Sequence, residues 1–215
     1  MANVRSDPGR LHLRWQPTLL SALGDAPTCD PSFATAQRIP LDDDAWVDHV
    51  SGWVQGAETL FEDIVEHAPW EHRTVQMYDR MVEEPRLTAW YGQAPSDADA
   101  PAIFTEMISA LGTRYDRAFD SVGAALYRDG RDSVAWHGDR VDPALVEPIV
   151  AIVSLGSART LRMRARWRRG ESRPFHLLPG DLFVIGGSAQ STWQHSVPKV
   201  KRAGARISVQ FRHST

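Results

Sequence analysis

Apolar positions repeat at helical spacing in the first half of the chain and at strand spacing in the second half. Around residues 58–66, apolar and acidic side chains fall on opposite faces of a predicted helix, and Pro69 marks its end. A second helix is predicted over residues 103–111. After about residue 120, short apolar runs such as 149–155 and 182–185 lie between Gly and Pro turns, which is typical of strands. This order predicts an α+β chain, mainly β, with a sandwich or barrel in its second half.

The C-terminal strand shows the clearest period of two. In residues 206–212, apolar side chains alternate with arginine, serine and glutamine. One interpretation is a half-exposed strand whose polar face meets water. The other is a strand whose polar face lines an internal pocket for an anion, with Arg206 and Arg212 about 20 Å apart along it.

A second stretch, residues 159–173, holds seven arginines among fifteen residues. Its even-numbered positions from Arg162 to Arg168 are all arginine and alternate with apolar side chains, so a strand here carries its charge on one face. The stretch is either a solvated edge strand that charge protects from aggregation or a ridge that contacts phosphates. The sequence leaves both interpretations open.

His137 and Asp139 stand two positions apart, a spacing at which strand residues share a face and are able to meet one ion. Such a pair is common by chance and needs a third ligand. The candidate is His195, which lies 56 residues after Asp139 and 11 residues before Arg206. Two histidines and one carboxylate with open positions form the facial triad of non-haem Fe(II) oxygenases. We refer to His137, Asp139 and His195 as the triad.

Charge is distributed unevenly along the chain. The totals of 24 Lys+Arg and 27 Asp+Glu give −3, which excludes a basic protein that coats polyanions and an acidic disordered tail. Residues 1–110 hold 7 basic and 18 acidic side chains, whereas residues 111–215 hold 17 and 9, so the halves carry −11 and +8. A basic second half is therefore still able to meet an anionic partner.

Cys29 is the only cysteine, so the fold does not depend on an internal disulfide. The first residues lack the apolar segment of a signal peptide, and no apolar run approaches the roughly 18 residues of a membrane span. We expect a soluble, cytoplasmic monomer that makes no membrane contact. Residues 1–40, rich in Pro, Asp, Ser and Thr, predict an extended arm.

Six segments together resemble the AlkB-type Fe(II)/2-oxoglutarate-dependent dioxygenase family. They extend from Pro85 to Arg212, over half of the chain, and are PRLTAWYG (85–92), LYRDGRDSVAWHGD (126–139), IVSLGSARTLRMR (152–164), GDLFVIGG (180–187), WQHSVPK (193–199) and RISVQFR (206–212). The resemblance implies a double-stranded β-helix (jelly-roll) core with N-terminal helices packed on it and a substrate-covering loop layer. It implies a single oxygenase domain over 41–215, in which 41–118 form the helical and substrate-lid part and 119–215 the jelly-roll catalytic core.

The resemblance also implies roles for individual residues. By the family pattern the triad binds Fe(II), and Tyr127 and Arg206 hold the distal carboxylate of 2-oxoglutarate. Ser208 belongs to the same cosubstrate set, and Arg212 lies near the C1 end of 2-oxoglutarate. The implied reaction uses O₂, converts 2-oxoglutarate to succinate and CO₂, and hydroxylates a substrate C–H bond. When that carbon is an N-methyl group, the product releases formaldehyde and leaves the free amine.

The leading interpretation is an oxidative demethylase of alkylated bases in DNA or RNA, with a role in DNA dealkylation repair. A methylated base must leave the base stack to reach the iron. Trp90 and Tyr91, in the family's substrate-proximal segment, are candidate stacking platforms, and Tyr78 and Trp136 are weaker ones; the alternative for each is an ordinary core aromatic. Three arginines are expected to contact phosphates: Arg131, Arg164 and Arg168.

Four positions depart from the family pattern. The usual Asn two residues before the tyrosine is Ala125, and the usual Asn of the C-terminal strand is Ser208. The acidic residue two positions after the metal Asp is Val141, with Asp142 adjacent, and the Tyr-x-Tyr expected soon after Gly92 is absent. The first two affect 2-oxoglutarate binding and the other two affect substrate recognition. Oxygenase chemistry is therefore better supported than alkylated-DNA repair.

Two other functions remain open. The first is the same oxygenase chemistry on a different substrate, such as a modified tRNA base, a protein side chain or a small metabolite. The second is a non-catalytic nucleic-acid-binding module that has kept the fold. It is the least favoured, because a decayed site would not be expected to keep both the triad and the two arginines of the C-terminal strand.

Overall fold

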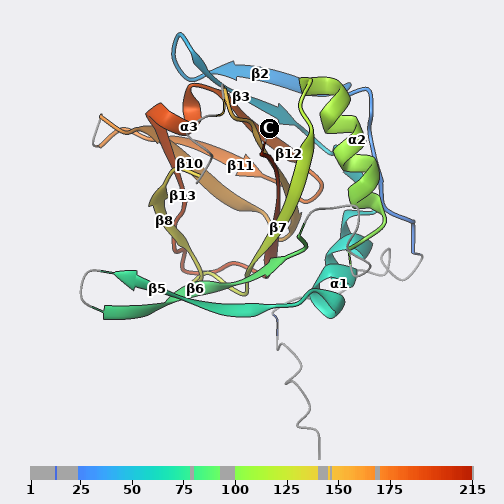
Figure 1. Ribbon diagram of the computed structural model, residues 1–215. Helices are drawn as coiled ribbons and strands as arrows, with labels where there is room; N and C mark the ends of the chain where they lie inside the picture. The colour runs from blue at the N-terminus through green and yellow to red at the C-terminus, as the bar shows by residue number, and fades with distance from the viewer. Residues whose placement is uncertain are drawn as a thin grey trace, which may run out of the picture.

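Two antiparallel sheets face each other in the computed structural model of the chain (Figure 1). The structure describes residues 13, 24–77, 80–92, 100–139, 145, 147–167 and 170–214. Within these residues no helix is both long enough and apolar enough to cross a membrane.

The larger sheet has eight strands and holds the C-terminal strand near its middle. In spatial order its strands are β2 (Ala36–Pro40), β3 (Ala45–Val50), β12 (Leu182–Gly187), β9 (Val150–Gly156), β14 (Arg206–His213), β7 (Phe119–Tyr127), β6 (Arg80–Trp90) and β5 (Glu71–Met77). Because β14 lies between β9 and β7, its backbone is paired on both sides. The register places Arg206 directly beside Tyr127 of β7.

The smaller sheet has four strands, in the order β11 (Arg173–Leu177), β10 (Arg159–Ala165), β13 (Trp193–Val197) and β8 (Val134–His137). A separate pair is formed by β1 (Thr28–Cys29) and β4 (Val54–Gln55). The β13–β8 register sets His195 opposite His137, so the two histidines of the triad share one face of this sheet. The sheet pairing therefore joins residues that are far apart in the sequence.

Two long helices cover the outer face of the larger sheet. They are α1 (Ala57–His67) and α2 (Ile103–Tyr115), and a short α3 (Ala189–Thr192) precedes β13. Both predicted helices are confirmed. The apolar stripe of α1, Leu60, Phe61 and Ile64, is buried, and full burial of each such side chain contributes about 1.5–3 kcal/mol. Figure 1 shows α1 and α2 on the same side of the molecule, away from the smaller sheet.

The space between the two sheets is apolar at one end and polar at the other. At the apolar end, Leu161 and Met163 of β10 pack with Phe183 and Ile185 of β12. At the other end, polar side chains of β6, β7 and β14 face β8 and β13 across a pocket of about 1450 Å³. The functional site therefore occupies the half of the sandwich that the hydrophobic core leaves unfilled.

The jelly-roll architecture predicted for the chain is confirmed, with differences in detail. The segment 41–118 contains strands β3, β5 and β6 of the larger sheet as well as the two helices, and β2 begins inside the predicted arm. The arginine strand ends at Ala165, because a turn begins at Arg166. It is also an inner strand, between β11 and β13, so the edge-strand interpretation is wrong.

Candidate metal and cosubstrate site

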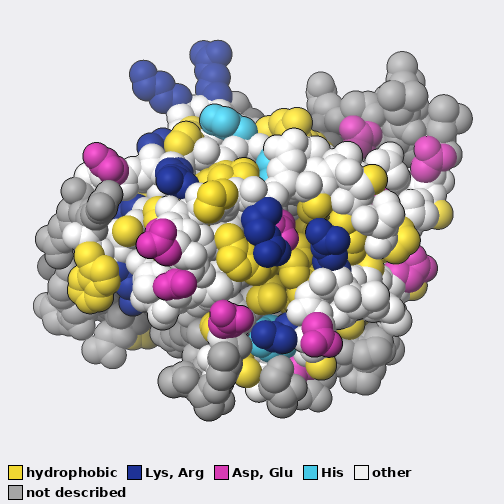
Figure 2. All heavy atoms as spheres, turned by 90° about the horizontal axis from the view of Figure 1, so that it is seen from above, with side chains coloured by type: hydrophobic (Ala, Val, Ile, Leu, Met, Phe, Trp, Pro, Cys, Tyr) yellow, Lys and Arg dark blue, Asp and Glu magenta, His cyan; other side chains and the backbone are white. Residues whose placement is uncertain are grey.

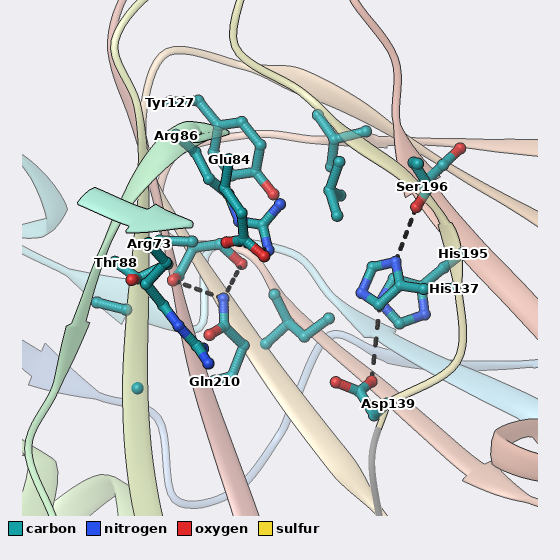
Figure 3. Close-up of a pocket in the computed structure, with 18 of the residues that line it drawn as sticks. Arg73, Glu84, Arg86, Thr88, Tyr127, His137, Asp139, His195, Ser196 and Gln210 are labelled. Atoms are coloured by element: carbon teal, nitrogen blue, oxygen red, sulfur yellow. Dashed lines mark hydrogen bonds and ion pairs between the residues drawn. The ribbon is translucent and has the colours of Figure 1, made fainter. Parts of the chain in front are cut away.

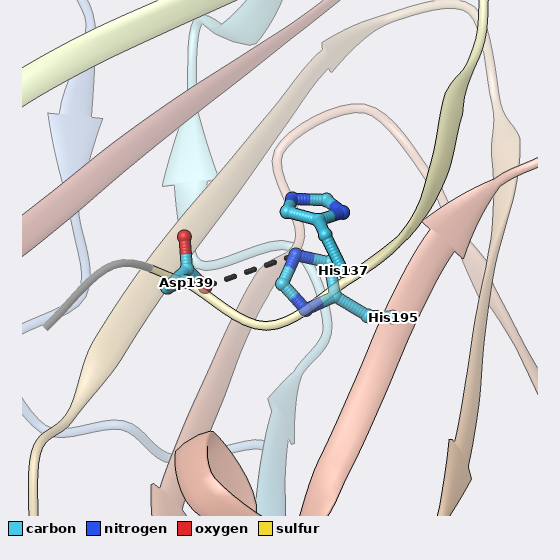
Figure 4. Close-up of side chains that lie close together, drawn as sticks. All are labelled: His137, Asp139 and His195. Atoms are coloured by element: carbon cyan, nitrogen blue, oxygen red, sulfur yellow. Dashed lines mark ion pairs between the residues drawn. The ribbon is translucent and has the colours of Figure 1, made fainter. Parts of the chain in front are cut away.

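The triad comes together at the polar end of the sandwich (Figure 4). One possible ligand atom from each of His137, Asp139 and His195 lies within 4.8 Å of the others. The two imidazole rings have centroids 4.3 Å apart. Since β8 and β13 are adjacent strands, the spacing of the histidines is fixed by backbone pairing rather than by a mobile loop.

The hydrogen bonds around the triad leave its ligand atoms free. His137 Nδ1 lies 2.9 Å from the carbonyl oxygen of Ala135, so it donates there and leaves Nε2 as the ligand atom. Arg212 Nη2 donates to Asp139 Oδ1 at 2.6 Å. Asp139 Oδ2 is buried and accepts no hydrogen bond from the described residues, and it lies 3.7 Å from His195 Nε2. A buried, unbonded carboxylate oxygen beside two imidazoles fits a divalent metal ion.

The protonation states suit metal binding as well. Burial lowers the pKa of His195 to about 4, so the imidazole is neutral at pH 7 and keeps a lone pair for a metal. Burial alone raises the pKa of Asp139, but the nearby positive charges, Arg212 among them, bring it below the usual value. The carboxylate is therefore ionised, as a metal ligand must be.

A buried guanidinium lines the same pocket as the triad. Arg206 is 1% exposed, and its Nε donates to Ser154 Oγ at 3.1 Å. Its Nη1 and Nη2 atoms are buried and have no hydrogen-bond acceptor among the described residues. Burial lowers the pKa of Arg206 to about 10, so the group stays charged at pH 7. Two buried donors on one cation fit a carboxylate, because this geometry allows bidentate binding.

Tyr127 and the rest of the β14 polar face complete this side of the pocket. The Tyr127 ring lies 5.4 Å from the Arg206 guanidinium. Ser208 and Gln210 line the pocket between the two arginines, and Gln210 Nε2 donates to Ser208 Oγ at 2.8 Å. The structure therefore favours the pocket-lining interpretation of this strand. Arg206 lies at the Tyr127 end, and Arg212 lies against the triad.

A third polar face, on β6, faces the triad across the pocket (Figure 3). Glu84, Arg86, Thr88 and Trp90 line the pocket, whereas the alternate residues Leu87 and Ala89 are buried in the core. Sequence reasoning missed this face. The signal was present, because polar and apolar positions alternate at period two from residue 84 to residue 89.

Comparison with known proteins identifies the family. Residues 49–212 match the family model described as the 2OG-Fe(II) oxygenase superfamily, which is more than half of the chain. The chain belongs to this superfamily.

Curated relatives place it among the AlkB-type members. Human alpha-ketoglutarate-dependent dioxygenase alkB homolog 3 is 31% identical over 178 residues, covering 74% of this chain and 62% of that protein. The Arabidopsis thaliana protein named DNA oxidative demethylase ALKBH2 is 27% identical, with the same shares of each chain covered. The chain thus spans less than two thirds of the length of these relatives. The prediction of an AlkB-type Fe(II)/2-oxoglutarate oxygenase is confirmed, and Fe(II), 2-oxoglutarate and O₂ are the cofactor and cosubstrates of its family.

Two solved structures share the fold. A structure described as OsALKBH1 superposes with a TM-score of 0.56 at 14% identity, covering 82% of this chain and all of that one. A prolyl hydroxylase from Trichoplax adhaerens, solved with a peptide fragment, gives a TM-score of 0.56 at 9% identity, with 78% of this chain and 83% of that one covered. At these identities the likeness supports the jelly roll alone.

The aromatic residues of this oxygenase are not equally placed for stacking on a base. Trp90 is 59% exposed at the pocket, and one side of its ring lies over Gly123, where a Cβ would be 3.4 Å from the ring. Tyr91 points the other way, is 1% exposed and packs edge-on against Phe104 in the core. Consecutive strand residues face opposite sides, so these two rings cannot share one role. Tyr91 is therefore a core group and not a stacking platform.

Trp136 borders the pocket, and an arginine covers one face of its ring. The Arg164 guanidinium is 4.2 Å from its ring centroid and donates to Gln194 Oε1. Trp136 borders the pocket, but His137, its neighbour on β8, supplies the side chain that joins the triad. Trp136 and Arg164 together form a surface beside the metal site.

Three predicted substrate-contact residues remain, namely Tyr78, Arg131 and Arg168. Arg131 is exposed and paired with Asp129 at 2.8 Å. Tyr78 and Arg168, together with Val141 of the family pattern, lie outside the described residues.

Arg159, which sequence reasoning counted with the arginine ridge, is buried. Its guanidinium donates to the carbonyl oxygens of Asp129, Asp132 and Pro198 at 2.9–3.0 Å. These carbonyls belong to the segments before β8 and after β13, so Arg159 ties together the two strands that carry the histidines. Its odd-numbered position on β10 could have revealed this, since Leu161 and Met163 share that face.

Proposed function

We propose that the chain is an Fe(II)/2-oxoglutarate-dependent demethylase of N-methylated nucleobases in DNA or RNA. The observation that carries the proposal is one pocket in which Asp139 Oδ2, buried and unbonded beside the two imidazoles of the triad, and the unbonded Nη atoms of Arg206 both lie. In this proposal the triad holds Fe(II), Arg206 and Tyr127 bind the distal carboxylate of 2-oxoglutarate, and Arg212 lies near its C1 end.

Side chains of the pocket would support the reaction by binding the cosubstrate and by orienting a metal ligand. Bound iron with 2-oxoglutarate and O₂ supplies the oxidising power that hydroxylates a C–H bond. Arg206 fixes one end of the cosubstrate by charge and by direction, and burial keeps water from competing for its donors. Arg212 holds Asp139 through Oδ1 and directs Oδ2 toward the metal position. A substrate N-methyl group only needs to be positioned beside the triad, because the hydroxylated methyl leaves as formaldehyde without further help.

The size of the pocket supports a substrate bound beside the cosubstrate. Pockets that bury one small molecule measure about 300–1,000 Å³, and this pocket measures about 1450 Å³. Trp90 lines it with an open ring face on which a flipped base would stack. The names of the AlkB relatives, one of them a DNA oxidative demethylase, support the same substrate class.

The outer face of β10 supports a nucleic-acid substrate. Arg162, Arg164 and Arg166 bind only neutral acceptors, namely Ser172, Gln194 and the backbone of Gln190, and none forms an ion pair within the part of the chain that the structure describes. Their charge remains available to phosphates. On the face drawn in Figure 2, which is seen from above the view of Figure 1, basic and acidic side chains are both interspersed among hydrophobic ones.

The decisive experiment supplies oligonucleotides that contain 1-methyladenine or 3-methylcytosine, together with Fe(II), ascorbate and 2-oxoglutarate, and follows base mass and succinate. Loss of the methyl mass with equimolar formaldehyde is expected. Succinate without demethylated base would favour the same chemistry on another substrate, such as a modified tRNA base, a protein side chain or a metabolite. No succinate under any condition would favour a non-catalytic binding module. A role in repair, a cytoplasmic location and a monomeric state stay predictions.

A further inference from the structure

The wall of the pocket that faces the triad carries a charged pair on β6. Glu84 and Arg86 are two positions apart on one strand face, with Glu84 Oε2 3.1 Å from Arg86 Nη2. Figure 3 shows both side chains on one side of the pocket, with His137, Asp139 and His195 on the other. A substrate held between these walls would meet the pair while its methyl group faces the triad.

The side chain of Glu84 is more buried than is usual for a carboxylate in a surface ion pair. Its side chain is 15% exposed, and Oε2 forms an ion pair with Arg86 but accepts no hydrogen bond of regular geometry from a described residue. Glu83, the preceding residue, has the same chemistry but is 61% exposed and pairs with His72 of β5. A partly buried carboxylate oxygen without a hydrogen-bond donor is able to accept a hydrogen bond from a ligand in the pocket.

The backbone holds this pair close to the metal strand. The Ser133 amide donates to the Pro85 carbonyl oxygen at 3.0 Å, which links β6 to the segment just before β8. Pro85 lies between Glu84 and Arg86, so the link fixes both side chains relative to His137. A rigidly placed acceptor is suited to discriminating between substrates.

We propose that Glu84 determines the base specificity of this enzyme by accepting a hydrogen bond from the exocyclic amino group of a cationic methylated base. The inference rests on the proposed function. Methylation of a ring nitrogen of cytosine or adenine gives the base a positive charge and leaves an amino donor next to the methyl group. Methylation of thymine leaves a neutral base with carbonyl oxygens on both sides of the methylated nitrogen. Glu84 attracts the first class, and its carboxylate repels the carbonyl oxygens of the second.

The test compares Glu84→Gln with the matched control Glu83→Gln. Each variant and the wild type receive single-stranded oligonucleotides that contain 3-methylcytosine or 3-methylthymine, and kcat/KM is measured for both. Wild type and Glu83→Gln are expected to prefer 3-methylcytosine equally. Glu84→Gln removes the charge and offers an amide donor to the thymine carbonyl, so the preference is expected to fall about tenfold or more.

A binding measurement separates recognition from turnover. The dissociation constants of the same oligonucleotides are measured by fluorescence anisotropy with Mn(II) in place of Fe(II), so no reaction occurs. The 3-methylcytosine preference in binding is expected to fall in Glu84→Gln and to persist in Glu83→Gln. Melting temperatures of the three proteins establish that each is folded.

Each outcome has one meaning. If Glu84→Gln slows both substrates by the same factor, or changes neither, Glu84 only supports Arg86 and the inference is overturned. If the wild type forms succinate but demethylates neither base, the proposed function fails, and the inference fails with it. A changed preference in kcat/KM and in binding supports both.

Discussion

Two strands of this protein carry arginines on a polar face whose residues alternate with apolar ones, and the structure gives the two sets of arginines opposite surroundings. On β14, Arg206 is 1% exposed and keeps two buried donors without an acceptor among the described residues. On β10, Arg162 and Arg164 face outward, and each is bonded to a neutral side chain. The two patterns look alike in the sequence, but only on β14 does the alternating arginine face line the pocket between the sheets.

The difference shows which buried charges point to a ligand. An exposed guanidinium reduces the free energy of unfolding very little, since water solvates it. A buried guanidinium with unused donors lowers stability unless a ligand accepts its hydrogen bonds. The unbonded Nη atoms of Arg206 are therefore suited to a bound anion. Arg159 is the informative intermediate: it is buried like Arg206, but backbone carbonyls occupy most of its donors, so its role is structural.

The largest effect on activity is expected at the proposed metal site. His137→Ala removes one of three ligands and should reduce Fe(II)-dependent succinate formation more than about 100-fold, beyond what a neighbouring hydrogen-bond partner costs. Loss of the Co(II) absorption bands would report the same change without turnover. The matched control is His176→Ala on β11, which bonds Thr160 and should retain both signals. Full activity of His137→Ala would show that the triad is not the metal site.

The next effect concerns the buried charge of β14. Arg206→Met should raise the KM for 2-oxoglutarate roughly 10- to 100-fold, because the distal carboxylate loses a charged, bidentate partner. Without ligand the variant should melt at the same temperature or higher, since a buried, partly unbonded charge is gone. The stabilisation that 2-oxoglutarate gives to the wild type should disappear.

The pKa of Arg206, lowered by burial to about 10, also predicts a pH profile. The guanidinium stays protonated below that value, so wild-type affinity for 2-oxoglutarate should be flat from about pH 6 to about pH 9. If Arg206→Met binds 2-oxoglutarate as the wild type does, the contrast between β14 and β10 is removed.

A smaller effect, on folding rather than on binding, is expected at the inward arginine of β10. Arg159→Met leaves one buried and two partly buried carbonyl oxygens without their donor and should lower the free energy of unfolding by about 3 kcal/mol. Its neighbour on the outward face serves as control, since Arg162→Met should change stability by less than about 0.5 kcal/mol. Urea unfolding of both variants checks the contrast. Equal changes in the free energy of unfolding for the two variants would mean that the two faces of β10 do not differ in their contribution to stability.

The smallest effect is expected on the outer face of β10. Arg162→Gln combined with Arg164→Gln should weaken binding of a single-stranded oligonucleotide about tenfold. The slope of log affinity against log salt should fall by roughly 0.7 for each phosphate that the protein no longer neutralises. Arg114→Gln, on the distant helix α2, removes one exposed positive charge and should leave the slope unchanged. An unaltered slope in the double variant would exclude this face from nucleic-acid binding.

The sequence predicted much of the site because its motifs lie on regular strands. The spacing of His137 and Asp139, the later His195 and the period-two pattern of 206–212 each depend on strand geometry, which holds wherever the strand lies. The same rule, applied to residues 84–90, would have identified Glu84 and Arg86 and separated Trp90 from Tyr91. The proline and the charged residues in that segment hid its strand character.

The sequence by itself determined the family, the helices α1 and α2, the triad and the two arginines of β14, because periodicity and motif spacing are local or survive in the order of the residues. Only the tertiary structure decided which polar faces meet inside the sandwich. Whether an arginine is buried beside a tyrosine, tied to three carbonyls or open to solvent depends on which strands pair, and pairing joins residues far apart in the chain. The register of β8 with β13 brought two distant histidines together, and the position of β14 between β9 and β7 turned a common alternating pattern into the wall of a pocket.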